Sequence, residues 1–123
     1  MIEMDKIEHI KSVCETIYKQ IGWSASKEVI MSWGISKLLW GIHNDMATLK
    51  LKVNGLIHKG WVYISYDEGS DIYIVTLLDN KNNIKSSHSP IYCDNLGSYL
   101  DNLIEKKTEW SYKEYEQELK KSS

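Results

Sequence analysis

Short strand-like segments separated by tight-turn residues fill the middle of this chain, and they restrict its fold more than any other feature. In residues 49–53 apolar side chains alternate with lysines, which is the pattern of a strand with one wet face. Residues 61–66 and 71–78 are rich in β-branched and aromatic side chains, and the Asp-Glu-Gly-Ser segment between them favours a hairpin loop. Connections this short join antiparallel neighbours, because parallel strands need a crossover of about a dozen residues or more. The segments therefore predict an antiparallel meander.

Further strands are predicted at both ends of this meander. Residues 34–42 are assigned to a strand, because a helix there would contain two glycines. A short strand is also expected near Ile84. The turns between the strands are assigned, in chain order, to residues 43–45, to Asn54-Gly55 or Gly60, to residues 67–70 and to residues 79–83.

Amphipathic segments on either side of the meander predict two helices. The first spans residues 3–21, and Gly22 is expected to end it. Its apolar stripe consists of Ile7, Ile10, Cys14, Ile17 and Ile21. Asp94 is expected to cap the second helix, which continues through about Lys106. The stripe of that helix consists of Leu96, Tyr99, Leu100, Leu103 and Ile104.

Two segments keep alternative interpretations. Residues 23–33 are ambiguous, although Ser26 can cap a short helical turn there. Residues 108–123 are polar, and they form either a helix or a loose tail. The chain as a whole is predicted to be α+β, with an antiparallel β-meander of four to five strands and an N-terminal and a C-terminal helix packed on it. Its 123 residues fit one domain, 1–123, since domains usually contain about 50–250 residues.

The charges argue against nucleic acid as a partner. The chain has a formal net charge of −2, and all 15 of its basic residues are lysines. Arginine is the preferred residue for bidentate recognition of phosphates and base edges. The lysines are also scattered along the sequence rather than clustered in a basic stripe.

The polar side chains lack the spacing of a metal, cofactor or catalytic site. Asp67, Glu68 and Asp71 surround one hairpin, where such residues serve as turn formers. The run that begins at Asp79 lacks the glycine and the glutamate of a calcium loop. The four histidines have no zinc spacing and are expected to be solvated, and the glycines form no phosphate loop. We therefore expect no metal, no cofactor and no catalytic residues, and the chain is predicted not to be an enzyme.

The two cysteines are expected to be reduced. Cys14 lies on the apolar stripe of the first helix and should be buried. Cys93 lies near the start of the second helix with His88 upstream, so a nucleophilic pair is conceivable, but a packed thiol is the favoured interpretation. The acidic N-terminus is unlike a signal peptide, and no segment is apolar enough to span a bilayer. These features predict a cytoplasmic protein.

Aromatic residues on the central strands form the candidate partner surface, which consists of Trp61, Tyr63 and Tyr73. Both faces of the hairpin formed by residues 61–66 and 71–78 are largely apolar, whereas antiparallel sheets usually have one wet face. Either helices cover both faces, or one face is covered by a partner or by the segment after Lys106.

Glycine, turn and aromatic motifs over residues 29–105 resemble a group of short uncharacterised proteins carried on bacterial phages and conjugative elements. The motifs are Ser32-Trp33-Gly34, Val53-Asn54-Gly55 with His58-Lys59-Gly60, Gly69-Ser70-Asp71-Ile72-Tyr73, and Tyr92-Cys93-Asp94-Asn95-Leu96 leading to Leu100-Asp101. The resemblance implies a mobile-element context and a cytoplasmic location, and it implies no reaction.

The function predicted from the sequence is a small non-catalytic protein-binding or regulatory module of a mobile element, which engages a protein partner or a second copy of itself. One alternative is an accessory protein associated with nucleic acid. Another is an enzyme with an unrecognised site. A contiguous patch of lysines would favour nucleic acid, whereas a deep pocket with a perturbed carboxylate, cysteine or histidine would favour an enzyme.

Overall fold

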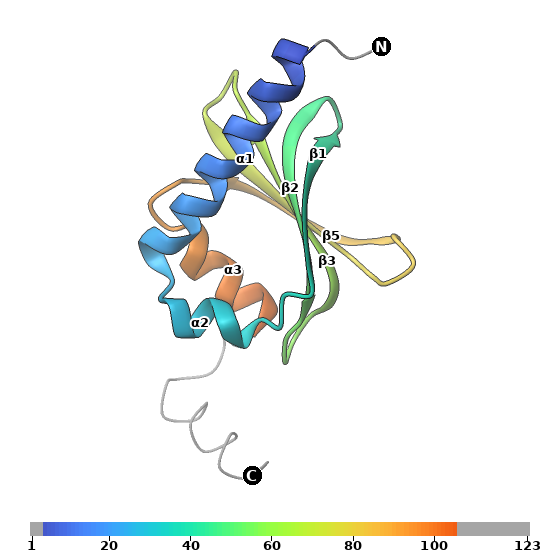
Figure 1. Cartoon of the computed structure of the whole chain (residues 1–123). Coiled ribbons are helices and arrows are strands. Elements are labelled where there is room, and N and C mark those ends of the chain that lie inside the picture. Colours follow the sequence, from blue (N-terminus) through green and yellow to red (C-terminus); the bar gives the residue numbers. More distant parts are fainter. Residues whose placement is uncertain (1–3, 106–123) are drawn as a thin grey trace, which may run out of the picture.

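The computed structural model describes residues 4–105, and its helices all lie on one side of a five-stranded sheet (Figure 1). The elements, in chain order, are α1 (Met4–Ser24), α2 (Lys27–Ser32), β1 (Lys37–His43), β2 (Met46–Asn54), β3 (Lys59–Asp67), β4 (Ile72–Leu78), β5 (Ile84–Ile91) and α3 (Leu96–Ile104). The predicted α+β class, with an antiparallel meander between an N-terminal and a C-terminal helix, is confirmed. The tail 108–123 lies outside the described residues.

The order of the strands in the sheet is their order in the chain, and every neighbouring pair is antiparallel. Tight turns make this order possible. Asn44 and Asp45 join β1 to β2 with φ values of 52° and 63°, and Asp71 before β4 has a φ of 53°. Asn and Asp tolerate this left-handed conformation better than other residues with a side chain, which explains their positions in these turns.

The first helix buries the predicted stripe but ends later than predicted. Ile10, Cys14, Ile17 and Ile21 are all buried in α1. Gly22 does not end the helix, which continues to Ser24. Contacts with α3 explain the extension, because the Ser24 hydroxyl accepts a hydrogen bond from the Ser98 amide at 2.9 Å.

The ambiguous segment 23–33 contains the end of α1 and the short helix α2. The Ser26 hydroxyl accepts a hydrogen bond from the Val29 amide at 3.2 Å, so the predicted helix cap is confirmed. Trp33 follows α2 and is fully buried, and its indole Nε1 donates to Asp101 Oδ1 at 3.0 Å. This bond ties the end of α2 to α3, and β1 begins only at Lys37 rather than at residue 34.

The second predicted helix is shifted at its start and shortened at its end. Asn95, not Asp94, is the residue at the cap of α3, and its side chain makes no capping bond. The Asn95 side chain instead accepts a hydrogen bond from the Tyr92 amide within the preceding turn. The helix ends at Ile104 rather than near Lys106, because the Ile104 carbonyl accepts from the amides of Ile57 and His58 in the β2–β3 connection.

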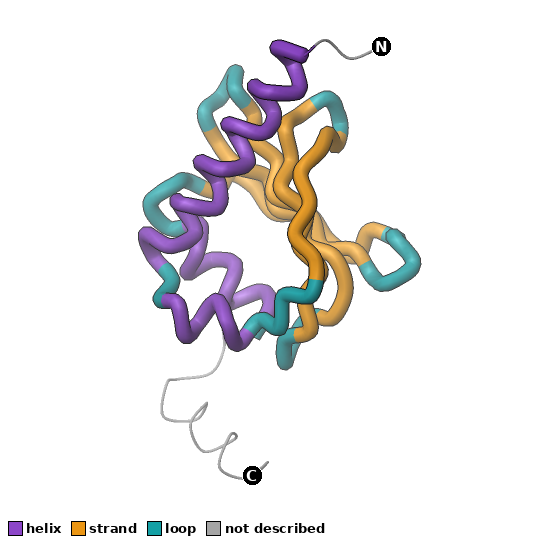
Figure 2. The backbone as a smooth tube through the Cα atoms, viewed as in Figure 1, coloured by secondary structure: helices purple, strands orange, loops and turns teal. Residues whose placement is uncertain are grey.

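The core lies between the helices and one face of the sheet, as Figure 2 shows from the side. Its sheet residues include Leu49, Leu51, Val62, Ile64 and Val75, which alternate with residues on the opposite face. No helix among residues 4–105 covers that opposite face, so the expectation that helices could cover both faces is wrong for the described chain. We call the uncovered side the open face.

Candidate functional site

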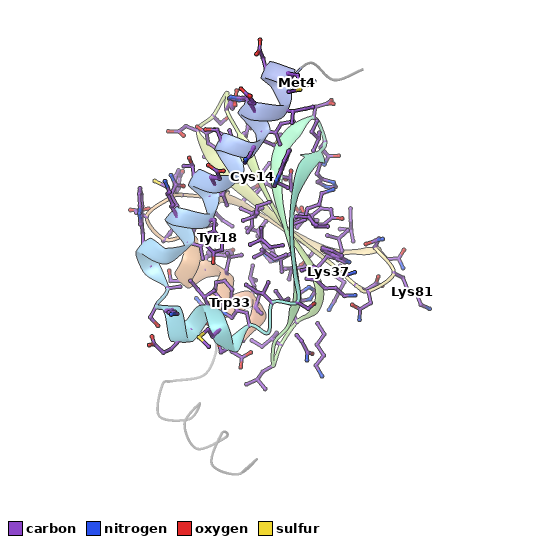
Figure 3. The ribbon with its side chains drawn as sticks, in the orientation of Figure 1. Met4, Cys14, Tyr18, Trp33, Lys37 and Lys81 are labelled. Atoms are coloured by element: carbon purple, nitrogen blue, oxygen red, sulfur yellow. The ribbon has the colours of Figure 1, made fainter. Side chains whose placement is uncertain are left out.

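The open face is formed by every second residue of the strands. The register of the sheet assigns to it Lys37, Leu39, Gly41 and His43 from β1, Met46, Thr48, Lys50, Lys52 and Asn54 from β2, Lys59, Trp61, Tyr63, Ser65 and Asp67 from β3, and Ile72, Ile74, Thr76 and Leu78 from β4. Lys37, labelled in Figure 3, lies at the start of β1 on the side away from α1. The face therefore combines lysines, aromatic rings, aliphatic side chains and small polar residues, with one carboxylate at its end.

Aromatic rings and lysines contact each other at the centre of the open face. The ring centroids of Trp61 and Tyr63 are 6.3 Å apart, and that of His43 is 5.2 Å from Tyr63. Lys50 Nζ lies 5.0 Å from the Tyr63 ring centroid, and Lys52 Nζ lies 5.9 Å from that of Trp61. Both distances fall within the range of cation–π attraction. The two central aromatic side chains are partly exposed, so their rings are accessible from outside.

Tyr73 does not belong to this surface, which corrects the predicted set of Trp61, Tyr63 and Tyr73. Tyr73 pairs with Tyr66 in the register, so it points to the helix side, where it is only 4% exposed. Its hydroxyl donates to Gln20 Oε1 of α1, and burial raises the pKa of Tyr73 to about 12. The face on which Tyr73 lies depends on the strand register, which the sequence alone does not give. A shift of one residue exchanges the two faces of a strand.

The fold gathers lysines that are far apart in the sequence. Lys37 and Lys52 are cross-strand partners, while Lys50 and Lys59 extend the same face. Among the five described strands the only carboxylate is Asp67, which lies at the end of β3 opposite Ile72 of the open face. The strand residues of the open face therefore carry four lysines and one carboxylate, Lys37, Lys50, Lys52, Lys59 and Asp67, so this face is positive although the whole chain is slightly negative.

Carboxylates gather instead at the turns near the start of α1. Asp45, Asp67 and Glu68 line one hollow together with Lys6 and His9. The ring of His9 pairs with the Glu68 carboxylate across this hollow. Not all carboxylates lie at this end of the sheet, since Glu105 lines another hollow together with Lys59.

The buried side chain of His58 hydrogen-bonds to the backbone of Trp61, at the aromatic centre of the open face. His58 is buried, contrary to the expectation that all four histidines are solvated. Its Nε2 must donate to the Trp61 carbonyl at 3.0 Å, so Nδ1 is left to accept from Lys85 Nζ at 3.4 Å. Burial lowers the pKa of His58, and the nearby Lys85 ammonium lowers it further, against the opposing effect of the Trp61 carbonyl.

A second surface lies at the edge of the sheet, where an apolar groove of about 360 Å³ separates α1 from β1. Leu38 and Trp40 of β1 form one wall, and Cys14 and Tyr18 of α1, labelled in Figure 3, contribute to the other. Lysines and a glutamate of α1 form its rim: Lys11, Glu15 and Lys19. Cys14 is buried, as predicted, and burial raises the pKa of its thiol.

The two edge strands of the sheet differ in character. In β1 the consecutive residues Leu38, Leu39 and Trp40 are 45%, 49% and 44% exposed. The opposite edge, β5, contains Lys85, Pro90 and three serines. Charged residues and proline at an edge discourage pairing with another chain, whereas an apolar edge strand invites it. Only β1 is therefore unprotected in this sense.

The exposed thiol and the histidine upstream of it do not form a pair. Cys93 is exposed rather than packed, and it lines a hollow of about 420 Å³ with Tyr66, Tyr73 and other residues. Two tyrosine hydroxyls of this hollow are already bonded: Tyr73 donates to Gln20, and Tyr66 donates to Asp71 at 2.6 Å, which raises the pKa of Tyr66 to about 12. The ring of His88 instead contacts Ser86 and Tyr99.

Within residues 4–105, no group of three or more His, Cys, Asp or Glu side chains is placed to hold a metal ion. None of the described helices has the length and apolar character needed to cross a membrane.

Comparison with protein-family models, with curated proteins and with solved structures gives no match to this chain. Function is therefore inferred from these surfaces alone.

Proposed function

We propose that this protein is a non-catalytic protein-binding module, and that its edge strand β1 pairs with β1 of a second copy. The observation that carries this proposal is the row Leu38, Leu39 and Trp40, each close to half exposed on an unprotected edge. Edge strands present unpaired backbone groups that can hydrogen-bond to a strand of another chain.

The exposed row favours a strand over other kinds of partner. Leu38 and Trp40 point to the groove beneath α1, whereas Leu39 points to the open face. A helix or a small ligand in the groove would cover the first two and leave Leu39 in water. A strand in the plane of the sheet contacts both sides at once, because its side chains alternate between the two faces.

A second copy of β1 fits this edge because the strand is complementary to itself. Antiparallel pairing about Trp40 places Leu38 opposite Ile42 and Leu39 opposite Gly41, with Lys37 opposite His43. Strand β1 contains no carboxylate. Apolar side chains then meet apolar ones, and the twofold symmetry is that of a closed dimer.

Light scattering after size-exclusion chromatography tests this arrangement. We expect the full chain to form a dimer at about 0.1 mM. At this concentration half of the chains are in dimers when the association free energy is about −5.5 kcal/mol. The change Trp40→Lys places two like charges directly opposite each other and should give a monomer with at least ~10-fold weaker association.

A matched change on the other edge serves as the control. Ser89→Lys adds the same charge to β5, where Ser89 is exposed, and it should leave the dimer intact. Leu38→Lys provides a second β1 variant should Trp40→Lys lower the melting temperature of the monomer. A wild-type chain that stays monomeric at 0.1 mM, or a dimer that both β1 variants preserve, would refute pairing through β1.

The mobile-element context and the cytoplasmic location stay predictions from the sequence resemblance. The enzyme alternative gains no support from the geometry. The tyrosines with raised pKa values beside Cys93 are bonded to Asp71 and Gln20, and the buried His58 lies elsewhere, bonded to the Trp61 carbonyl.

A further inference from the structure

We propose that the open face binds single-stranded nucleic acid without sequence specificity, with bases stacked on Trp61 and Tyr63 and phosphates held by the surrounding lysines. This function goes beyond the proposed pairing through β1 and uses other side chains. It rests on three observations: the aromatic rings, the lysines around them and the absence of helices over the face among residues 4–105.

The two aromatic rings are spaced for an extended strand of nucleotides. Trp61 and Tyr63 lie two residues apart on β3, so they point to the same side, and their centroids are 6.3 Å apart. This is nearly twice the rise of about 3.4 Å between stacked bases of one strand. The two ring planes are inclined by 70°, so bases stacked on them would be inclined to each other as well. Each ring can therefore take one base of a strand whose own bases have separated. Stacking on aromatic side chains is the usual way in which single strands are bound without regard to sequence.

The lysines lie where the phosphates of such a strand would pass. Lys50 and Lys52 already sit over the Tyr63 and Trp61 rings. A base that stacks on a ring would displace the ammonium to its side, where it can pair with the adjacent phosphate. Lys37 and Lys59 extend the positive region along the neighbouring strands.

The same residues explain why the open face would bind single strands of any base sequence and would not bind duplexes. A lysine ammonium is a point charge without the planar fork that reads base edges, so it binds phosphate alone. The bases of a duplex are stacked on each other, which leaves their flat faces unavailable to Trp61 and Tyr63. A sheet face with partly exposed rings is thus suited to single strands.

The net charge of the chain does not oppose this binding. Charges at the surface are screened beyond about 8 Å at physiological ionic strength, so a bound phosphate interacts mainly with the nearest groups. Around Trp61 and Tyr63 these are Lys50 and Lys52, whereas Asp67 lies at the far end of β3 and lines the hollow near the start of α1 with Asp45 and Glu68. The negative net charge of the chain therefore does not describe the centre of the open face.

Fluorescence anisotropy with a labelled oligo-dT of about 12 nucleotides tests the proposal. We expect binding at low salt that is at least ~10-fold tighter than binding of a duplex of equal length. Contacts with three or four phosphates predict a slope of about −2 to −3 in a plot of log affinity against log salt.

Two substitutions on the face have matched controls elsewhere. Trp61→Ala should weaken oligo-dT binding by about 5- to 150-fold, whereas Trp23→Ala, on the 64% exposed tryptophan of α1, should not. Lys52→Ala should reduce the magnitude of the salt slope by about 0.7, whereas Lys19→Ala on α1 should leave it unchanged. Trp61→Phe should restore most of the affinity and would show that loss in Trp61→Ala is due to stacking rather than to misfolding.

Binding of the short oligonucleotide should not depend on dimer formation. Trp40 lies on the opposite face of β1, so the Trp40→Lys variant should bind the same oligonucleotide equally well. Four results would overturn the proposal: no binding at low salt, equal binding of duplex, equal binding of poly-glutamate, or affinities that Trp61→Ala and Lys52→Ala leave unchanged. Binding of poly-glutamate would identify the face as a site for acidic protein segments instead.

Discussion

His58 shows how one residue links the stability of the sheet to the open face. Both of its ring nitrogens are engaged, with the Trp61 carbonyl on one side and the Lys85 ammonium on the other. Burial lowers the pKa of His58, and so does the Lys85 ammonium, at which a proton on Nδ1 would point. The bond to Trp61 holds the backbone of a residue whose side chain lies at the centre of the aromatic cluster.

We expect the folded chain to lose stability as the pH falls below about 6.5. The pKa of His58 is lowered in the folded state, whereas the unfolded chain titrates near the ordinary value of 6.5. The unfolded state therefore takes up the proton first, and its free energy falls relative to the folded state. Urea unfolding at pH 7.5 and at pH 5.5 measures the difference.

The variant His58→Gln isolates this contribution, because its amide can still donate to the Trp61 carbonyl but does not titrate. The free energy of unfolding of this variant should depend less on pH between 5.5 and 6.5. An equal dependence in both proteins would assign the effect to other groups.

At the scale of elements, the packing of α3 against α1 depends on a glycine. A Cβ atom at Gly97 would lie 2.1 Å from the Ile21 carbonyl oxygen and 2.8 Å from Ala25 Cβ. The two helices therefore approach each other through their backbones. Gly22, by contrast, has nothing within 4 Å of its ideal Cβ position and lies inside α1.

Substitution of these two glycines by alanine should have opposite effects. Gly97→Ala should lower the free energy of unfolding by about 1–3 kcal/mol or more, because the helices must separate. Gly22→Ala should raise it by roughly 0.5–1 kcal/mol, because alanine favours a helix interior. Denaturant unfolding monitored by far-UV circular dichroism measures both. A Gly97→Ala protein as stable as the wild type would show that α1 and α3 do not pack this closely.

Element types were largely predictable from the sequence, and element ends were not. The stripe of α1 and the alternation in β2 are local patterns, and each corresponds to an element of the predicted type. Ends depend on distant groups: Ser98 extends α1, and the β2–β3 connection stops α3 at Ile104. Strand β5 was expected only as a short strand near Ile84, because its eight mostly polar residues show no apolar alternation and are ordered by backbone pairing with β4.

At the scale of the whole molecule, the candidate surfaces could be predicted only in part. Trp61 and Tyr63 were identified as surface aromatics, but Tyr73 was placed with them because register is not visible in one sequence. The lysines appeared scattered because their grouping arises from cross-strand pairing. The groove beside β1 needed the position of α1, for which the sequence offers no direct signal.

A dimer paired through β1 would have a larger nucleic-acid-binding surface than one chain. Antiparallel pairing through β1 would join two five-stranded sheets into one, with both open faces on the same side. Their lysines and aromatic rings would then form a single longer track. A dimer would therefore hold an oligonucleotide long enough to span both faces more tightly than the Trp40→Lys monomer does, by the gain that two linked sites provide.

The grouping of lysines on the open face gives this molecule a positive side that its isoelectric point conceals. At pH 7 the chain lies above its calculated isoelectric point of about 6.1, and a uniformly charged protein of net charge −2 would pass through a cation-exchange column. A molecule with a positive side can instead turn that side toward the resin, which it contacts over one face only. We expect the protein to be retained on the column at low salt. A variant with both Lys50→Ala and Lys52→Ala should elute earlier. The same loss of charge at Lys6 and Lys11 on α1 should change the elution less. Equal elution of both variants would mean that the resin senses net charge alone. If the expectation holds, the protein would meet any charged surface in a preferred orientation, with the open face turned toward negative charge before contact is made.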